Sequence, residues 1–309
     1  MRAMATQRRV VLALGGNALI RPGETGTAEE QMLRLREVAA GLGTLGDCEL
    51  VVTHGNGPQV GEVLLRSELC VDEVPPMPMD LAVASTQGSI GTMFVQALRL
   101  ALGRPVVTVL SHTLVDPDDP AFQAPEKYIG RFYAEAEALD RKAQLGWTVA
   151  EDPGRGWRRV VPSPRPVAVL EADAVASLLE RGVVVVAGGG GGVPVMEHHG
   201  ALTGLEAVVD KDRVSALLAT QLGAELLVVL TGVDQVLVGF GTPAAAPLAE
   251  VDPGTLRAHL EAGEFPPGSM GPKIEAVLDF VGPGRDALIT SPERLPDALA
   301  GVTGTWVRG

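Results

Sequence analysis

Residues 183–212 read VVVVAGGGGGVPVMEHHGALTGLEAVVDKD, and this stretch decides the fold of the chain. Its first part, Val183–Ala187, is continuously apolar, which is typical of a strand buried on both faces of a sheet. Gly188–Gly192 follow at once, so the strand opens onto backbone that a ligand can approach closely. In an open α/β sheet, ligands bind at this carboxyl edge of the strands. The stretch therefore predicts a mainly parallel sheet with a binding site beside the glycines.

The same strand-to-glycine pattern occurs twice nearer the N-terminus. Val10–Leu14 and Leu50–Thr53 are apolar runs, and helical apolar spacing over Glu29–Leu42 connects them. Each run passes directly into a turn, and the turn residues of interest are Gly15, Gly16, Asn17, Gly55, Asn56 and Gly57. Such turns suit anion binding by backbone amides, although simple tight turns have the same sequence pattern.

The second turn differs from a dinucleotide-binding fingerprint. Residues 54–61 read HGNGPQVG, which is G-x-G-x-x-x-G with Pro58 inside, and no persuasive acidic ribose partner follows at the expected distance. This disfavours a Rossmann NAD site. His54 has two interpretations, a catalytic base or a hydrogen-bonded structural residue at a strand end, and the second is the commoner.

Composition limits the classes of function. The 309 residues carry a net charge of −13, which argues against nonspecific binding to nucleic acid. No apolar run approaches the roughly 18 residues of a membrane span, and no signal peptide is recognisable, so we expect a cytoplasmic protein with no membrane partner. Cys48 and Cys70 show no metal-binding spacing, and we expect no protein-ligated metal site.

The use of lysine points to particular residues. Only four of the 25 basic residues are lysines, namely Lys127, Lys142, Lys211 and Lys273. A lysine kept against such a preference for arginine suggests a site that needs a compact ammonium charge. Lys142 follows Asp140 and Arg141 in an ordinary helix-surface pattern. Lys273 ends the loop that leads into the predicted helix 274–281 and so sits in the first helical turn, where the helix dipole disfavours a cation. An anionic ligand explains this placement of a lysine better than folding does.

Residues 112–166 interrupt the alternation of strands and helices. The segment is rich in charged residues, proline and aromatics, and Lys127 lies within it. An excursion of this length is usually a functional lid or small subdomain, although a decorative insertion is the alternative.

The C-terminal part provides a second set of candidates. Asp210, Lys211 and Asp212 open a helical pattern that continues to Leu222. The next predicted strand, Leu226–Leu230, leads into a turn where Thr231 and Asp234 flank apolar residues. This turn is suited to a purine ring and its ribose, but an ordinary strand-end turn would look similar.

Glycine turns and selected lysines together indicate a phosphate-containing polyanion. The chain has no P-loop, protein-kinase, G-x-S-x-G or H-E-x-x-H motif. Phosphoryl transfer needs mainly positioning and electrostatic stabilisation, which glycine amides and lysines can supply. In this interpretation Asp210 and Asp212 orient the lysines or help to hold Mg²⁺.

Seven motifs, taken together and in order, resemble the carbamate kinases of the amino-acid kinase superfamily. They are LGGNA (14–18), THGNGPQVG (53–61), QGSIG (87–91), VPSP (161–164), GGGGGVP (188–194), VDKD (209–212) and PGSMGPK (267–273). The resemblance covers nearly the whole chain. It implies a three-layer α/β/α sandwich with a central, mainly parallel sheet and a small protruding lid subdomain at about 112–166. It also implies an N-terminal lobe (1–195) for carbamate or carbamoyl phosphate and a C-terminal lobe (196–309) for the nucleotide.

The resemblance further implies an activity and its residues. The activity is reversible phosphoryl transfer between carbamoyl phosphate and ADP, giving carbamate and ATP, with Mg²⁺, in a homodimer and in arginine metabolism. The implied catalytic residues are Lys127, Lys211, Asp212 and Lys273. The implied substrate contacts are Gly15, Gly16, Asn17, Gly55, Asn56 and Gly57. The implied nucleotide contacts are Asp210, Thr231, Val233, Asp234 and Met270, with the adenine contacts near residues 231–241.

One residue departs from the family pattern. The family usually has Lys-Pro-Ile-Gly in the lid, whereas this chain has Lys127-Tyr128-Ile129-Gly130. Tyr128 removes the fixed φ of proline, which leaves open the rigidity of the lid and the identity of the acceptor. Two other hypotheses therefore stand beside carbamate kinase: an amino-acid-kinase enzyme acting on a different small acid or phosphate, and a nonenzymatic nucleotide or metabolite sensor.

Overall fold

A central sheet of eight strands organises the molecule. The computed structural model describes residues 7–15, 19–20, 23–152, 154–266 and 268–309. The sheet order is β15 (Glu250–Val251), β17 (Thr305–Val307), β16 (Asp286–Thr290), β12 (Leu226–Leu230), β1 (Arg9–Leu14), β2 (Glu49–His54), β9 (Val184–Val186) and β3 (Val106–Thr108). Every neighbouring pair is parallel except β16 and β17. The predicted mainly parallel sheet is confirmed.

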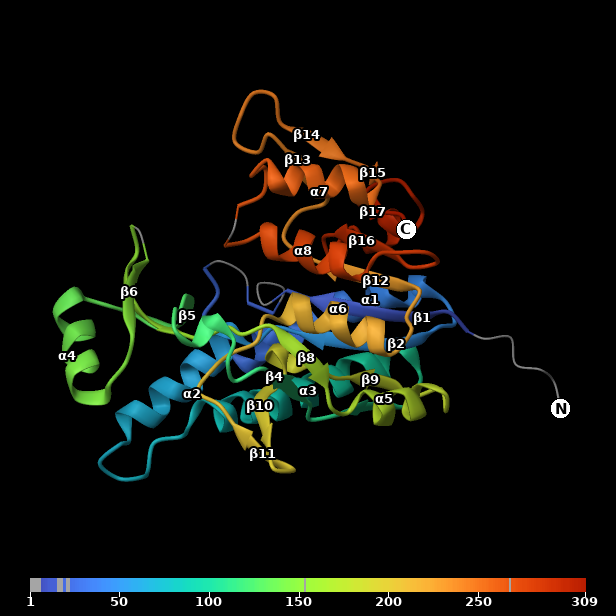
Figure 1. Ribbon diagram of the computed structural model, residues 1–309. Coiled ribbons are helices and arrows are strands. Elements are labelled where there is room, and N and C mark those ends of the chain that lie inside the picture. The colour runs from blue at the N-terminus through green and yellow to red at the C-terminus, as the bar shows by residue number, and fades with distance from the viewer. Residues whose placement is uncertain (1–6, 16–18, 21–22, 153, 267) are drawn as a thin grey trace.

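Helices cover both faces of this sheet, which makes three layers (Figure 1). Strand β1 shows why, because its side chains alternate between two separate apolar cores. Val11 and Ala13 pack with residues of α5 (Ala172–Leu179), α6 (Lys211–Gln221), α7 (Pro253–Glu261) and α8 (Gly271–Phe280). Leu12 and Leu14 pack on the other side with residues of α1 (Ala28–Leu42), α3 (Met79–Leu102) and α9 (Leu295–Leu299). The predicted α/β/α sandwich is therefore confirmed.

The glycine run after β9 carries the chain from the central sheet into a second sheet. This sheet has the order β11 (Ala201–Gly204), β10 (Val193–His198), β4 (His112–Val115) and β8 (Pro166–Val169). Gly188, Gly190, Gly191 and Gly192 all have positive φ. A Cβ at Gly191 would lie 2.1 Å from the carbonyl oxygen of Val209, so the run packs directly on the segment that precedes α6.

A third, smaller sheet projects from the body of the molecule (Figure 1). It has the order β5 (Lys127–Tyr133), β7 (Gly156–Val161) and β6 (Val149–Asp152), and α4 (Glu135–Leu145) joins β5 to β6. The helix α2 (Gly57–Leu69) packs beside β5. The projecting part lies inside the predicted lid at 112–166, whereas the ends of that segment, β4 and β8, pair in the second sheet.

The N-terminal and C-terminal parts of the chain each form one half of the central sheet. Strands β1, β2, β3 and β9 come from the first 195 residues, and β12, β15, β16 and β17 come from the rest. The boundary expected after residue 195 falls inside β10. The hairpin of β13 (Val236–Val238) and β14 (Ala246–Leu248) completes the C-terminal half. Within the described residues, no helix has the length and apolar character needed to cross a membrane.

The packing of Gly191 gives a prediction about stability. Gly191→Ala is expected to lower the free energy of unfolding by more than about 3 kcal/mol, because the new methyl group meets a backbone oxygen and the residue keeps a left-handed φ. Gly223→Ala is the matched control, since Gly223 also has positive φ but open space around its Cβ position. It should cost only about 1–2 kcal/mol. Urea unfolding of both variants measures the difference, and equal losses would contradict the close contact.

Candidate functional site

A cavity of about 1180 Å³ opens at the carboxyl edge of the central sheet. Gly15, Gly55, Thr231 and Ser291 line it, and each follows directly after a strand of that sheet. The projecting sheet, α6 and α8 contribute further lining residues, among them Tyr128, Lys211 and Lys273. The site therefore lies where parallel strands place ligands, at the edge predicted from the glycine run.

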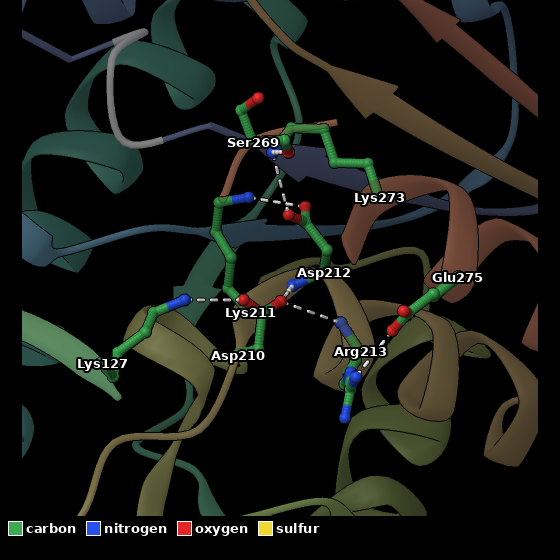
Figure 2. Close-up of polar contacts among 8 residues, drawn as sticks. All are labelled: Lys127, Asp210, Lys211, Asp212, Arg213, Ser269, Lys273 and Glu275. Carbon is green, nitrogen blue, oxygen red and sulfur yellow. Dashed lines mark hydrogen bonds and ion pairs between the residues drawn. The ribbon is translucent and has the colours of Figure 1, made fainter. Parts of the chain in front are cut away.

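Asp212 lies at the centre of a charged cluster in this cavity (Figure 2). Its Oδ1 accepts a hydrogen bond from Lys211 Nζ at 2.6 Å, and its Oδ2 accepts one from Lys273 Nζ at 3.1 Å. Only 4 % of the Asp212 side chain is exposed. Burial by itself would raise the pKa of this carboxyl, but the two ammonium groups outweigh burial and lower the pKa. Asp212 is therefore a buried carboxylate that joins the start of α6 to the start of α8.

Asp210 holds the third lysine of the cluster. It is the N-cap of α6, where its Oδ1 accepts a hydrogen bond from the amide of Asp212 at 2.9 Å. Its Oδ2 accepts one from Lys127 Nζ, also at 2.9 Å, and Lys127 is the first residue of β5. Burial opposes ionisation here too, but Lys127 and the neighbouring donors lower the pKa of Asp210. The cap thus connects the projecting sheet to the centre of the site.

The structure brings together the three lysines that the sequence analysis singled out. The side chains of Lys211 and Lys273 are 14 % and 16 % exposed, whereas that of Lys127 is 46 % exposed. The fourth lysine, Lys142, lies exposed on α4, as expected for a surface residue. A cluster of ammonium groups in a protein of net charge −13 is an anion site, because the local charge opposes the overall charge.

The glycine turns were expected to bind an anion through their backbone amides, but two of these amides bond to neighbouring strands. The Gly15 amide donates to Leu230 O at 3.0 Å, and the Gly55 amide donates to Leu14 O at 3.1 Å. Both amides thus complete the hydrogen bonding of neighbouring strands, and a contact of Gly15 or Gly55 with substrate stays a prediction. Gly57 begins α2, where backbone amides have no partner within the helix. Gly16 and Asn17 lie outside the described residues.

Asn56 and His54 form a buried layer beneath the cavity. Asn56 Nδ2 donates to Thr86 Oγ1 at 2.8 Å, and its side chain lies so close to Gly190 that a Cβ there would be 2.2 Å away. His54 is fully buried, stacks on Phe94 with ring centroids 5.3 Å apart, and places Nδ1 3.0 Å from Gly55 O. Burial lowers the pKa of His54 to about 4, so the ring is neutral near pH 7. This favours the structural interpretation of His54.

The C-terminal half of the chain also lines the cavity. Thr231, Val233, Asp234 and Met270, predicted from the sequence, all line it. Leu237 and Phe240, which lie within the stretch 231–241 implied for adenine contacts, also line it, whereas sequence reasoning missed Phe265 and Ser291. Ser291 Oγ donates to Asp234 Oδ1 at 2.6 Å, which fixes the Asp234 carboxylate. Phe240 is 65 % exposed between two glycines, and an isolated aromatic in such a loop is a signal that the sequence offered.

The described residues contain no cluster of three or more histidine, cysteine or acidic side chains that could hold a metal ion. Both oxygens of Asp212 accept hydrogen bonds from lysines, and both oxygens of Asp210 also have donors. The donor set therefore fits a metal ion that is held largely by the phosphates of a bound ligand, as Mg²⁺ usually is.

Comparisons with known proteins place these features among kinases. The profile of the amino acid kinase family matches residues 8–291. A carbamate kinase of Thermococcus kodakarensis is 46 % identical over 97 % of this chain and 99 % of its own length. A carbamate kinase of Halobacterium salinarum is 45 % identical over 96 % and 97 % of the two chains. The structure of a carbamate kinase from Giardia lamblia bound to AMP-PNP superposes with a TM-score of 0.92, at 36 % identity and 99 % coverage of both chains.

The buried histidine gives a prediction about pH. The folded-state pKa of His54 lies below the value of about 6.5 in an unfolded chain, so the unfolded state binds more protons between pH 6.5 and 4. The stability that neutral His54 contributes is present above pH 6.5 and is lost as the pH falls, by about 3 kcal/mol at pH 4. Urea unfolding across this range should show a shallower pH dependence for His54→Gln than for the wild type. Parallel curves would contradict the buried, neutral histidine.

Proposed function

Because the chain belongs to the amino acid kinase family, and within it to the carbamate kinases, we propose that it transfers a phosphoryl group reversibly between carbamoyl phosphate and ADP, giving carbamate and ATP. The resemblance identified from the sequence is confirmed. One observation carries the proposal at the level of chemistry: three lysines from three separate elements meet on two carboxylates, the buried Asp212 and the partly buried Asp210, inside a cavity at the ligand-binding edge of the sheet.

The lysine pair on Asp212 stabilises the transferring phosphoryl group. In the transition state, negative charge spreads over the three equatorial oxygens of this group, and preorganised positive charge lowers its energy. Lys211 and Lys273 are two such charges, fixed in place before substrate binds because both bond to Asp212. Asp212 acts as their organiser, and its own carboxylate is fully engaged.

Lys127 adds charge from the projecting sheet. Its ammonium group lies on the Asp210 cap, at the boundary between β5 and the start of α6. Because its side chain is half exposed, Lys127 can exchange Asp210 for a phosphate oxygen when substrate enters. This supports a role for Lys127 in holding carbamoyl phosphate during transfer.

Different lining residues of the cavity bind the two substrates in this proposal. We assign carbamoyl phosphate and carbamate to the part of the cavity that Gly15, Gly55, Asn56 and Gly57 line, within residues 1–195. We assign the nucleotide to the part of the cavity that Thr231, Val233, Asp234 and Met270 line, within residues 196–309. The AMP-PNP-bound Giardia relative, whose fold this chain shares over its length, supports a nucleotide at this site. Asp210, which also lines the cavity, is assigned to the nucleotide as well.

Mg²⁺ accompanies the nucleotide in this proposal, with its phosphates as the main ligands and Asp210 and Asp212 nearby. When bound, it neutralises charge on the β- and γ-phosphates. The remaining expectations, a homodimer in the cytoplasm and a role in arginine metabolism, rest on the family resemblance.

Turnover tests the proposal directly. ATP formation from ADP, carbamoyl phosphate and Mg²⁺, followed in a coupled assay, is expected at a kcat within the usual enzyme range of roughly 1–1,000 s⁻¹. A panel of small acids and phosphates with ATP covers the alternative acceptors. No turnover by folded protein that still binds ADP would favour the sensor hypothesis and contradict the proposed kinase.

The role of the lysine pair gives a sharper prediction. Lys211→Arg should lower kcat at least a hundredfold, corresponding to about 3–4 kcal/mol, because the planar guanidinium cannot reproduce the compact charge held by Asp212. The dissociation constant of ADP should change little. Lys142→Arg is the matched control and should leave kcat unchanged, since Lys142 lies exposed on α4. Equal losses in kcat and ADP affinity for Lys211→Arg would indicate a binding role instead.

A further inference from the structure

The position of Lys127 needs an explanation, because burial does not fix it. Its side chain is 46 % exposed, yet its Nζ lies 2.9 Å from Asp210 on another element. Lys127 is also the first residue of β5, where a strand can fray. Whatever holds the start of β5 therefore decides whether the ammonium group reaches the site.

Tyr128, the next residue, ties β5 across the projecting sheet. Its own strand neighbour is Val160 on the central strand β7. Its hydroxyl nevertheless donates to the carbonyl oxygen of Glu151 at 2.7 Å, and Glu151 lies on β6, beyond β7. The side chain therefore spans the middle strand and connects the two outer strands of the sheet.

Arg158 adds a second restraint from β7. Its guanidinium carbon lies 5.7 Å from the centre of the Tyr128 ring and 5.0 Å from that of Phe132, within the range of cation–π attraction. One of its Nη atoms donates to Gly130 O at 3.0 Å, and the other lies 3.6 Å from Asp152 Oδ2. Arg158 thus contacts every second residue of β5 from 128 to 132.

The same part of β5 packs closely on α2. A Cβ at Gly61 of α2 would lie 3.0 Å from Gly130 Cα, so the backbones of helix and strand meet with no side chain between them. α2 starts at Gly57, on the cavity wall. Strand β5 is therefore held between a helix that begins at the site and the contacts made by Arg158 and Tyr128.

We infer that Tyr128 is a positioning residue for Lys127, which it keeps within reach of the α6 cap by bonding to Glu151 and packing against Arg158. Both Tyr128 and Lys127 line the cavity, and the restraint acts on the strand that carries them. A displacement of the lysine by about 1 Å can cost a large factor in rate, because catalytic groups act only from near their productive geometry. The kinetic part of this inference rests on the proposed kinase function.

A double-mutant cycle tests the inference. Tyr128→Ala should lower kcat roughly tenfold in the wild-type background and less than about twofold in the Lys127→Ala background, because residues that act through one another are not additive. The KM for ADP should stay unchanged. Tyr128→Phe keeps the ring and loses only the hydroxyl, so it should restore part of the lost rate. Equal losses in the two backgrounds would overturn the inference.

Hydrogen exchange provides a measurement that does not depend on turnover. In full-length Tyr128→Ala, amides of residues 127–133 should exchange several-fold faster, while those of α6 keep the wild-type rates. Leu139→Ala, a truncation on the exposed surface of α4, is the control and should change neither exchange in β5 nor kcat. Unchanged exchange in β5 of Tyr128→Ala would overturn the inference. An inactive wild type with the expected exchange pattern would instead count against the proposed function alone.

Discussion

A buried carboxylate between two ammonium groups is the interaction on which this structure depends. Removing the Asp212 carboxylate from water is costly, and Lys211 and Lys273 offset that cost. The dependence is mutual, because two lysines at helix N-termini face an unfavourable helix dipole and need the anion between them. Loss of the carboxylate would leave two neighbouring ammonium groups without a counter-charge. The positive charges of the cluster are therefore preorganised before substrate binds.

The rest of the fold brings this cluster to the sheet edge. Parallel strands end together, so the turns after β1, β2, β12 and β16 share one cavity. The glycine run after β9 has no side chains, which lets Asn56 and the backbone of Val209 pack against it. That contact places the Asp210 cap, and the cap in turn receives Lys127 from the projecting sheet. The position of each of these groups thus depends on the contact before it.

Local patterns in the sequence predicted the parts that depend on local physics. Apolar runs gave the buried strands, and the scarcity of lysine pointed to Lys127, Lys211 and Lys273, which the fold brings together. The sequence did not predict hydrogen-bond partners that lie far apart in the chain. The strand-to-strand use of the Gly15 and Gly55 amides depends on sheet order. The Ser291–Asp234 bond and the restraint on Tyr128 likewise depend on which strands become neighbours, and periodicity does not encode that.

Asp212 presents Lys211 and Lys273 to the phosphoryl group as it is transferred. A crystal structure of the protein with ADP, Mg²⁺ and an aluminium fluoride mimic of the transferring group tests it most directly. We expect both Nζ atoms to lie within about 3 Å of the fluoride ligands while both remain bonded to Asp212. A mimic bound with both lysines still paired to Asp212 but out of hydrogen-bonding range of it would contradict the claim.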